Sequence, residues 1–152
     1  DARGLTFYTN YGSRKAEEIA AHAQVTVVFP WYPLHRQIVV SGMVTKVSRE
    51  EAAEYWKVRP HLSQLGAMAS AQSAKIESRE MLEKVMSDLQ QQYPEGSHVP
   101  LPENWGGFLI VVENMEFWQG RQSRLHDRLR FESLGGHDLS ATNTWKAQRY
   151  SP

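Results

Sequence analysis

The sequence has no cysteine, no excess of charge of either sign and no long hydrophobic run. Without cysteine, the chain has no disulfide and no Cys-ligated zinc or iron–sulfur cluster. The 17 Lys and Arg residues balance 17 Asp and Glu residues, which argues against nucleic acid or an anionic membrane as the main partner. Apolar runs such as residues 108–112 are far shorter than the roughly 20 residues that cross a membrane. We therefore expect a soluble, cytoplasmic protein.

The 152 residues are enough for one domain with a sizeable core, and a hydrophobic content of 41% excludes a disordered chain. Residues 1–4 carry a turn signal directly before a strand-like run, and a turn needs an element in front of it. We expect a single domain over residues 1–152 that lacks an N-terminal segment.

Runs of β-forming residues alternate with amphipathic helical stretches along the chain. Pro30 is expected to end the second strand, and Gly42 to mark a bulge or bend inside the third. Helices are predicted over residues 13–22, 48–58, 60–70 and 78–93, and strands over residues 5–9, 24–29, 36–47, 105–112, 115–119, 125–132 and 145–150. Tight turns join several strands, so an antiparallel barrel or sandwich with helices fits better than a βαβ sheet.

Arg14 and Lys15 lie at the predicted start of the first helix. A helix N-terminus favours anions, so two cations there are mildly unfavourable unless a phosphate binds among them. The alternative interpretation is a solvated basic pair that Glu17 and Glu18 offset.

Residues 121–130 contain four arginines and a histidine. If residues 124–130 are extended, alternation puts Arg124, His126, Arg128 and Arg130 on one face of a strand. Such a face repels itself unless something anionic or electron-rich lies on it. The alternative is a solvated edge strand that its charge protects from aggregation.

Tyr55 and Arg59 are four residues apart on one helix face, and Ser63 falls in the first turn of the next helix. Two hydroxyls and a guanidinium near a helix N-terminus suit a phosphate, although a helix surface with a partly buried arginine explains them as well. Gln72 and Ser73 lie between two helices, where capping is the default role. The six histidines show no ligand spacing, so we predict no metal.

These stretches occur together in a recognisable order, and the chain resembles the pyridoxine (pyridoxamine) 5′-phosphate oxidase family. The resemblance covers all 152 residues. The segments that carry it are Phe7–Asn10, Ser13–Lys15, Arg36–Gln37, Arg59–Pro60 through Gln72–Ser73, Trp105–Gly107, Glu116–Gly120, Arg124–Arg128 and Trp145–Pro152. The last of these is similar to a closing W-x-x-x-R-L-x-P motif, with Tyr150 in place of Leu.

The resemblance implies a Greek-key-like antiparallel split β-barrel with flanking helices, which forms a homodimer with FMN at the subunit interface. It implies that the flavin is bound by Tyr8, Thr9, Arg14, Lys15, Gln72 and Ser73, and from the partner subunit by Gln37, Trp118 and Arg128. It assigns Tyr55, Arg59 and Ser63 to the substrate phosphate. Arg124 and His126 would be the catalytic residues, which lie over the pyridine ring and also bind the substrate.

The implied reaction oxidises pyridoxine 5′-phosphate or pyridoxamine 5′-phosphate to pyridoxal 5′-phosphate. O2 is the final oxidant, H2O2 is released, and the amine also yields NH3. Family members carry an R-x-x-L-L-K-like strand before the turn, and this sequence begins after it. The alternatives are a flavin oxidase of the same fold acting on another substrate, as in phenazine biosynthesis, a non-catalytic module that binds pyridoxal 5′-phosphate, and an interaction domain for an acidic partner.

Overall fold

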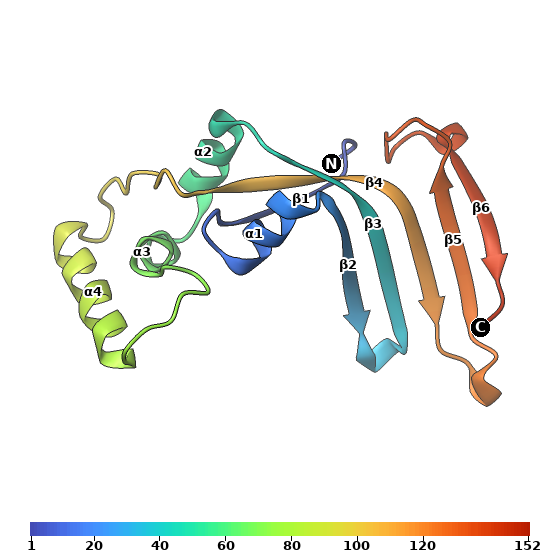
Figure 1. Cartoon of the computed structure of the whole chain (residues 1–152), viewed down its shortest axis with the longest axis horizontal. Helices are drawn as coiled ribbons and strands as arrows, with labels where there is room; N and C mark the ends of the chain where they lie inside the picture. Colours follow the sequence, from blue (N-terminus) through green and yellow to red (C-terminus); the bar gives the residue numbers. More distant parts are fainter. The chain divides into compact units, whose positions relative to one another are not determined.

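The computed structural model describes all 152 residues, and Figure 1 shows its helices and strands in chain order. The helices are α1 (Arg14–Ala21), α2 (Arg49–Val58), α3 (His61–Ala69) and α4 (Arg79–Gln92). The strands are β1 (Leu5–Asn10), β2 (Gln24–Trp31), β3 (Arg36–Lys46), β4 (Trp105–Gln119), β5 (Asp127–Ser133) and β6 (Trp145–Tyr150). None of the four helices combines the length and the apolar character needed to cross a membrane.

The six strands form one sheet in the order β2-β3-β4-β5-β6, and β1 pairs with β4. The pairs β2–β3, β4–β5 and β5–β6 are antiparallel. This topology confirms the predicted fold class, a mainly β antiparallel protein with added helices.

The chain divides into two compact units. Unit 1 comprises residues 1–6, 22–45 and 109–152, and unit 2 comprises residues 7–21 and 46–108. The four helices therefore belong to unit 2, whereas β2, β5 and β6 belong to unit 1. A single domain over the whole chain stays a prediction.

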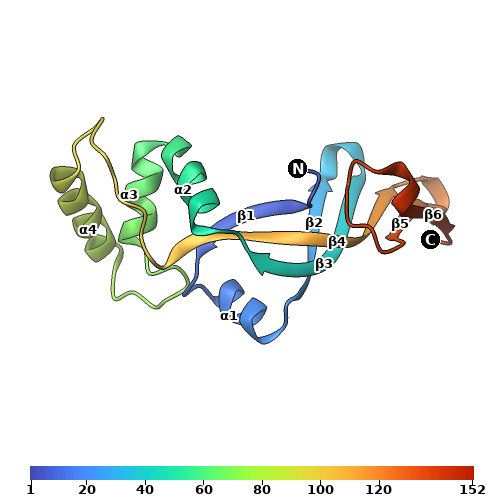
Figure 2. The same cartoon turned by 90° about the horizontal axis from the view of Figure 1, so that it is seen from above.

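The core of unit 2 is built around two tryptophans. Trp56 from α2 and Trp105 from β4 are each 3% exposed, and they pack with Leu65 and Val99. The indole Nε1 of Trp56 donates to the Val99 carbonyl at 2.9 Å. Figure 2 shows α2, α3 and α4 beside one another around this core. Packing of these helices holds the end of α2 and the start of α3 in place.

Two helices of this unit begin with a side-chain cap, and the one at Ser48 was predicted from its capping box. The Ser48 hydroxyl accepts from the Glu51 backbone N–H at 3.1 Å, at the start of α2. The Ser78 hydroxyl accepts from the Met81 N–H at 3.3 Å, at the start of α4. Each bond satisfies a donor that the first helical turn otherwise leaves free.

Two strands are longer than predicted. Strand β2 continues through Pro30 to Trp31, because β2 lies at the edge of the sheet and the missing N–H of a proline is tolerated there. Strand β4 is continuous where two strands were expected. Asn114 lies opposite Glu132, so pairing with β5 carries the extended conformation through the polar residues.

The expectation of a bulge at Gly42 is wrong. Its pairing with Val25 is in register with the residues on either side, so the β2–β3 ladder is unbroken. The glycine is needed for another reason, since a Cβ atom at this position would lie 2.1 Å from the carbonyl oxygen of Val111. Strand β4 therefore approaches too closely for any larger residue.

Candidate functional site

A pocket of about 360 Å³ opens in unit 2 where β1, α3 and the segment after α3 meet. We call it the Arg59 pocket. It is lined by Tyr8, Thr9, Asn10, Arg59, Ser63, Gly66, Ala67, Ser70, Gln72 and Trp105. Five of the residues that the sequence singled out, from three separate stretches, therefore share one cavity.

Arg59 is the cation of this pocket. Its guanidinium lies over the rings of Trp105, at 4.9 Å from the centroid, and Trp56, at 5.7 Å. Nη2 donates to the carbonyl oxygen of Ser63 at 3.0 Å, whereas Nε is buried without any partner. A buried donor without an acceptor is costly, and such exceptions often mark a ligand site. An arginine held on aromatic faces beside serine hydroxyls fits a phosphate group.

Thr9 links Gln72 of the pocket wall to Lys15 of α1. Its hydroxyl donates to Gln72 Oε1 at 2.9 Å and lies 3.3 Å from the Lys15 ammonium, which donates to it. The Asn10 N–H donates to the same Gln72 oxygen at 3.1 Å. With that oxygen engaged, the Gln72 side chain has its NH2 group left for a ligand. The amide NH2 of Gln72 and the ammonium of Lys15 thus lie close to the Arg59 pocket. Two such donors fit a phosphorylated, hydrogen-bonding molecule such as a flavin nucleotide.

Aromatic rings cover one side of this region. The rings of Tyr8 and Tyr55 stack at 3.8 Å with an interplanar angle of 8°, and Trp105 is nearly parallel to both. Tyr55 therefore packs against Tyr8 and Trp105, and the Trp105 ring also lies under Arg59. The assignment of Tyr55 to the substrate phosphate stays a prediction.

Arg14 and Ser73 lie apart from the pocket lining. Arg14 pairs with Glu18 at 2.8 Å, and its side chain is 82% exposed. This pairing agrees with the alternative interpretation of Arg14 as a solvated cation that an acid offsets. Ser73 is exposed and has a left-handed backbone with φ of 71°. The assignment of both residues to a flavin stays a prediction.

Unit 1 holds a second group of candidate residues, on the hairpin of β4 and β5. Glu116 on β4 is 7% exposed and accepts from both Arg128 and Arg130 on β5. Its two oxygens lie 3.0 Å from Arg128 Nε and Nη2, and Oε2 lies 2.9 Å from Arg130 Nη2. The self-repelling basic face expected from the sequence is thus neutralised by an acid of the neighbouring strand.

The pKa of the Glu116 carboxyl is held below its usual range, chiefly by the hydrogen bond from Arg128, with Arg130 adding to the effect and burial opposing it. The same bond raises the pKa of Arg128. Arg128 also donates through Nη1 to the Ser151 carbonyl at 3.0 Å. Because the Arg128 guanidinium is already paired with Glu116, its remaining N–H groups suit a carbonyl oxygen or ring nitrogen better than a free anion.

Sequence reasoning missed Glu116. The signal lay in the register of the β4–β5 hairpin, which places Glu116 directly opposite Arg130. Oppositely charged cross-strand pairs of this kind are common, but they are visible only after the strands are aligned.

Arg124 and His126 do not lie in a strand, so the expected extended face over residues 124–130 is wrong. Strand β5 begins at Asp127, and Ser123 and Arg124 have φ of 57° and 61°. A 3-10 turn over Gln122–Arg124 leads into His126, whose ring packs on Trp118 at 4.8 Å between centroids. Only Arg128 and Arg130 share the alternating face.

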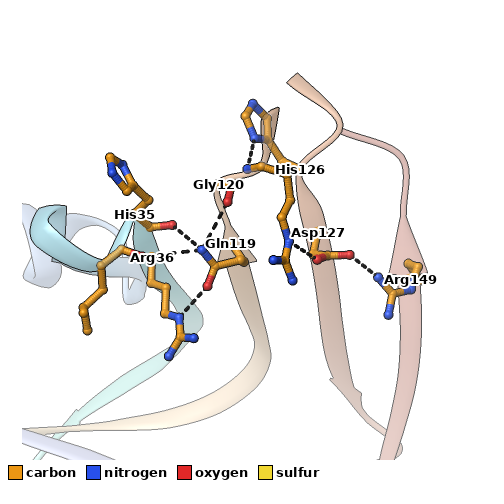
Figure 3. Close-up of polar contacts among 9 residues, drawn as sticks. His35, Arg36, Gln119, Gly120, His126, Asp127 and Arg149 are labelled. Carbon is orange, nitrogen blue, oxygen red and sulfur yellow. Dashed lines mark hydrogen bonds and ion pairs between the residues drawn. The ribbon is translucent and has the colours of Figure 1, made fainter. Parts of the chain in front are cut away.

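A smaller pocket of about 330 Å³ in unit 1 brings together Gln37 and Trp118, two of the residues predicted to contact a flavin. Arg36, Asp127 and Arg149 also line it. Figure 3 shows polar contacts that involve its lining residues Arg36, Gln119, Asp127 and Arg149. Gln119 accepts from Arg36 and donates to the carbonyl of His35 at 3.2 Å, which ties β4 to the turn before β3.

Two family models match the chain. Residues 1–93 match the model described as pyridoxamine 5′-phosphate oxidase. Residues 105–152 match the model described as the pyridoxine 5′-phosphate oxidase C-terminal dimerisation region. Together the matches cover both units.

Curated relatives agree with the family models. A pyridoxine/pyridoxamine 5′-phosphate oxidase of Streptomyces avermitilis is 49% identical over 152 residues, which are 100% of this chain and 65% of the relative. One of Prochlorococcus marinus is 44% identical, with coverages of 100% and 67%. One of Frankia casuarinae is 53% identical over 134 residues, 88% of this chain and 50% of the relative. The chain thus spans one half to two thirds of the length of these relatives.

Two solved structures share the fold. PhzG from Burkholderia lata, in complex with tetrahydrophenazine-1-carboxylic acid, has a TM-score of 0.86 and 29% identity, covering 100% of this chain and 70% of its own. A pyridoxamine 5′-phosphate oxidase-related, FMN-binding protein from Nostoc punctiforme has a TM-score of 0.69 and 15% identity, with coverages of 97% and 72%. The likeness supports the split-barrel fold class predicted from the sequence.

Proposed function

Because the chain belongs to the pyridoxamine 5′-phosphate oxidase family, we propose that it is an FMN-dependent oxidase of vitamin B6 metabolism. Its substrates are pyridoxine 5′-phosphate and pyridoxamine 5′-phosphate, and its product is pyridoxal 5′-phosphate. O2 accepts the electrons and leaves as H2O2, and oxidation of the amine substrate also consumes water and releases NH3. A cytoplasmic location is part of the same proposal.

The observation that carries the proposal is the unpartnered Nε of Arg59 inside a pocket with hydroxyl groups. We assign Tyr55, Arg59 and Ser63 to the substrate phosphate. Hydrogen bonds that involve a charged group contribute about 1.5–3 kcal/mol each, so two or three of them would anchor a small phosphate ester. Tyr8 and Tyr55 stack on each other, so only the outer face of this pair is left for an aromatic ring to pack on.

We assign the flavin to Tyr8, Thr9, Arg14, Lys15, Gln72 and Ser73 in unit 2. The matched dimerisation region supports a homodimer, and in it Gln37, Trp118 and Arg128 of unit 1 would reach the flavin of the partner subunit. When bound, FMN supplies the redox chemistry, in which a hydride leaves the substrate C4′ and two electrons pass to O2. This chain's own Arg124 and His126 hold the pyridine ring in the orientation that the hydride transfer needs.

Two measurements test the proposal on the protein loaded with FMN. The absorbance spectrum should show bound flavin, and both 5′-phosphates should drive O2 uptake and H2O2 formation. A flavin-loaded sample that oxidises neither substrate contradicts the proposal. Tight binding of pyridoxal 5′-phosphate without any flavin would favour the non-catalytic module instead.

A second candidate is a flavin oxidase of phenazine type, which the TM-score of 0.86 to PhzG favours. We expect a phenazine enzyme to lack the Tyr55, Arg59 and Ser63 set, because a phenazine carboxylic acid has no phosphate to hold. Turnover of a reduced phenazine carboxylic acid in place of the two 5′-phosphates would decide for this candidate.

A further inference from the structure

The turn before β5 provides a hydrogen-bond donor to the imidazole of His126. Nδ1 of His126 lies 3.1 Å from the backbone nitrogen of Arg121, whose N–H donates to it. Figure 3 shows this hydrogen bond as a dashed line to the His126 ring. The ring thus closes a loop of six residues that begins immediately after Gly120.

In a neutral imidazole, one ring nitrogen carries the proton and the other accepts. A backbone N–H is only a donor, so the nitrogen that faces it must be the acceptor. The proton of neutral His126 therefore lies on Nε2. We infer that the Arg121 backbone N–H fixes His126 as the Nε2–H tautomer, which makes this residue a hydrogen-bond donor to the substrate and not a proton acceptor. The part about the substrate rests on the proposed function.

Several contacts hold the Arg121 N–H in place. The Arg121 side chain donates through Nε to Asp127 Oδ2 at 2.8 Å, and Asp127 also pairs with Arg149 on β6. The left-handed pair Ser123 and Arg124 folds the turn tightly. The donor and its imidazole acceptor are thus both fixed, since Trp118 packs against the His126 ring from β4.

The tautomer limits the chemistry open to His126. Its one free ring position carries a hydrogen, and its lone pair is already used by Arg121. If Nδ1 took up a proton, the hydrogen bond would be lost. The ring Nδ1–H and the Arg121 backbone N–H would then be two donors facing each other. A fixed Nε2–H instead suits an oxygen acceptor on the substrate ring, so His126 orients the ring while proton removal falls to another group or to water.

The tautomer is measurable without flavin or substrate. We propose ¹⁵N NMR of the imidazoles in the full chain, at a pH well above about 6.5, the ordinary histidine pKa. The His126 signals are identified by their loss in His126→Gln. The expected pattern is a protonated Nε2 and a bare Nδ1. Arg121→Lys is the matched control, because it keeps the backbone N–H and a cation beside Asp127, and it should show the same pattern. A protonated Nδ1 in the wild type overturns the inference.

Kinetics test the donor role separately. A glutamine amide reaches the position of Nε2, whereas an asparagine amide reaches only that of Nδ1. With one hydrogen bond at stake, we expect kcat/KM of His126→Asn to fall about tenfold further than that of His126→Gln. Equal losses in the two variants overturn the donor role. If the wild type oxidises neither 5′-phosphate but NMR finds the Nε2–H tautomer, the proposed function fails and the tautomer assignment stands.

Discussion

Substitution of Glu116 by glutamine should destabilise the protein markedly. Glu116 holds two arginines, and its side chain is 10% exposed, whereas those of Arg128 and Arg130 are 29% and 32% exposed. Removal of one partner from a fully buried ion pair costs about 3–5 kcal/mol. Water reaches the two arginines in part, so we expect a loss of about 2–3 kcal/mol in the free energy of unfolding.

Urea unfolding at neutral pH measures this loss, as a lower midpoint with an unchanged m-value. Glu113→Gln is the matched control, because it removes the same charge from the same strand. Glu113 accepts an exposed hydrogen bond from Gln24 at 3.3 Å, so its substitution should cost no more than about 0.5 kcal/mol. Equal effects of the two substitutions would refute the claim that Glu116 neutralises a basic face.

The stabilities of the wild type and Glu116→Gln should also depend differently on pH. The pKa of Glu116 is lower in the folded state than in the unfolded chain, so its stabilisation is complete above the unfolded value of about 4.3. It is lost as the pH falls through the folded-state pKa, where the carboxyl takes up a proton. The difference in stability between the wild type and Glu116→Gln should therefore shrink below about pH 4, and a difference that grows there would contradict the sign.

Two further predictions concern the Arg59 pocket and one close contact in the sheet. Arg59→Met should raise KM for pyridoxine 5′-phosphate by about 10-fold to 100-fold, because a charged hydrogen bond to the phosphate is lost. Lys57→Met, an exposed cation two residues earlier, should leave KM unchanged in the same steady-state assay. Gly42→Ala should lower the Tm strongly, because its methyl group would meet the Val111 carbonyl at 2.1 Å. Gly66→Ala in α3, where nothing lies within 4 Å, should raise the free energy of unfolding by about 0.5–1 kcal/mol, and calorimetry compares the two.

Features with a local cause were predicted correctly from the sequence. The cap at Ser48 depends on a side chain and a backbone group three residues apart, so the motif contains both partners. The helix over Arg79–Gln92 follows from apolar spacing within one segment. These signals need no knowledge of distant strands.

Features that depend on a distant partner were missed or misplaced. Strand β2 continues through Pro30 because it lies at the edge of the sheet and pairs on one side only. The order of strands in a sheet cannot be predicted from a short stretch of sequence. Glu116 became visible only when the register set it opposite Arg130. The turn at Ser123 and Arg124 has a left-handed backbone that neither residue type favours, so extension was the reasonable default.

In the site, residue types were predictable but their grouping was only partly so. Helix spacing placed Tyr55 beside Arg59, and Ser63 was expected in the first turn of the next helix. Arg59 and Ser63 line one pocket, whereas Tyr55 is not among its lining residues. The bond between Thr9 and Gln72 joins residues 63 positions apart, and no spacing rule predicts it. The family resemblance named both residues without stating their contact.

The tryptophans of the two units differ in exposure, so their intrinsic fluorescence differs as well. Trp56 and Trp105, both 3% exposed, lie in unit 2, whereas Trp31 of unit 1 is 45% exposed. Indoles shielded from water emit at shorter wavelengths than hydrated ones, and here the emission of Trp105 also senses the cationic Arg59 above its ring. Trp118 and Trp145 of unit 1 are half-buried, so the blue edge of the fluorescence band reports mainly on unit 2 and the red edge mainly on Trp31 of β2. A denaturation recorded at two wavelengths would follow the melting of each unit without any added dye.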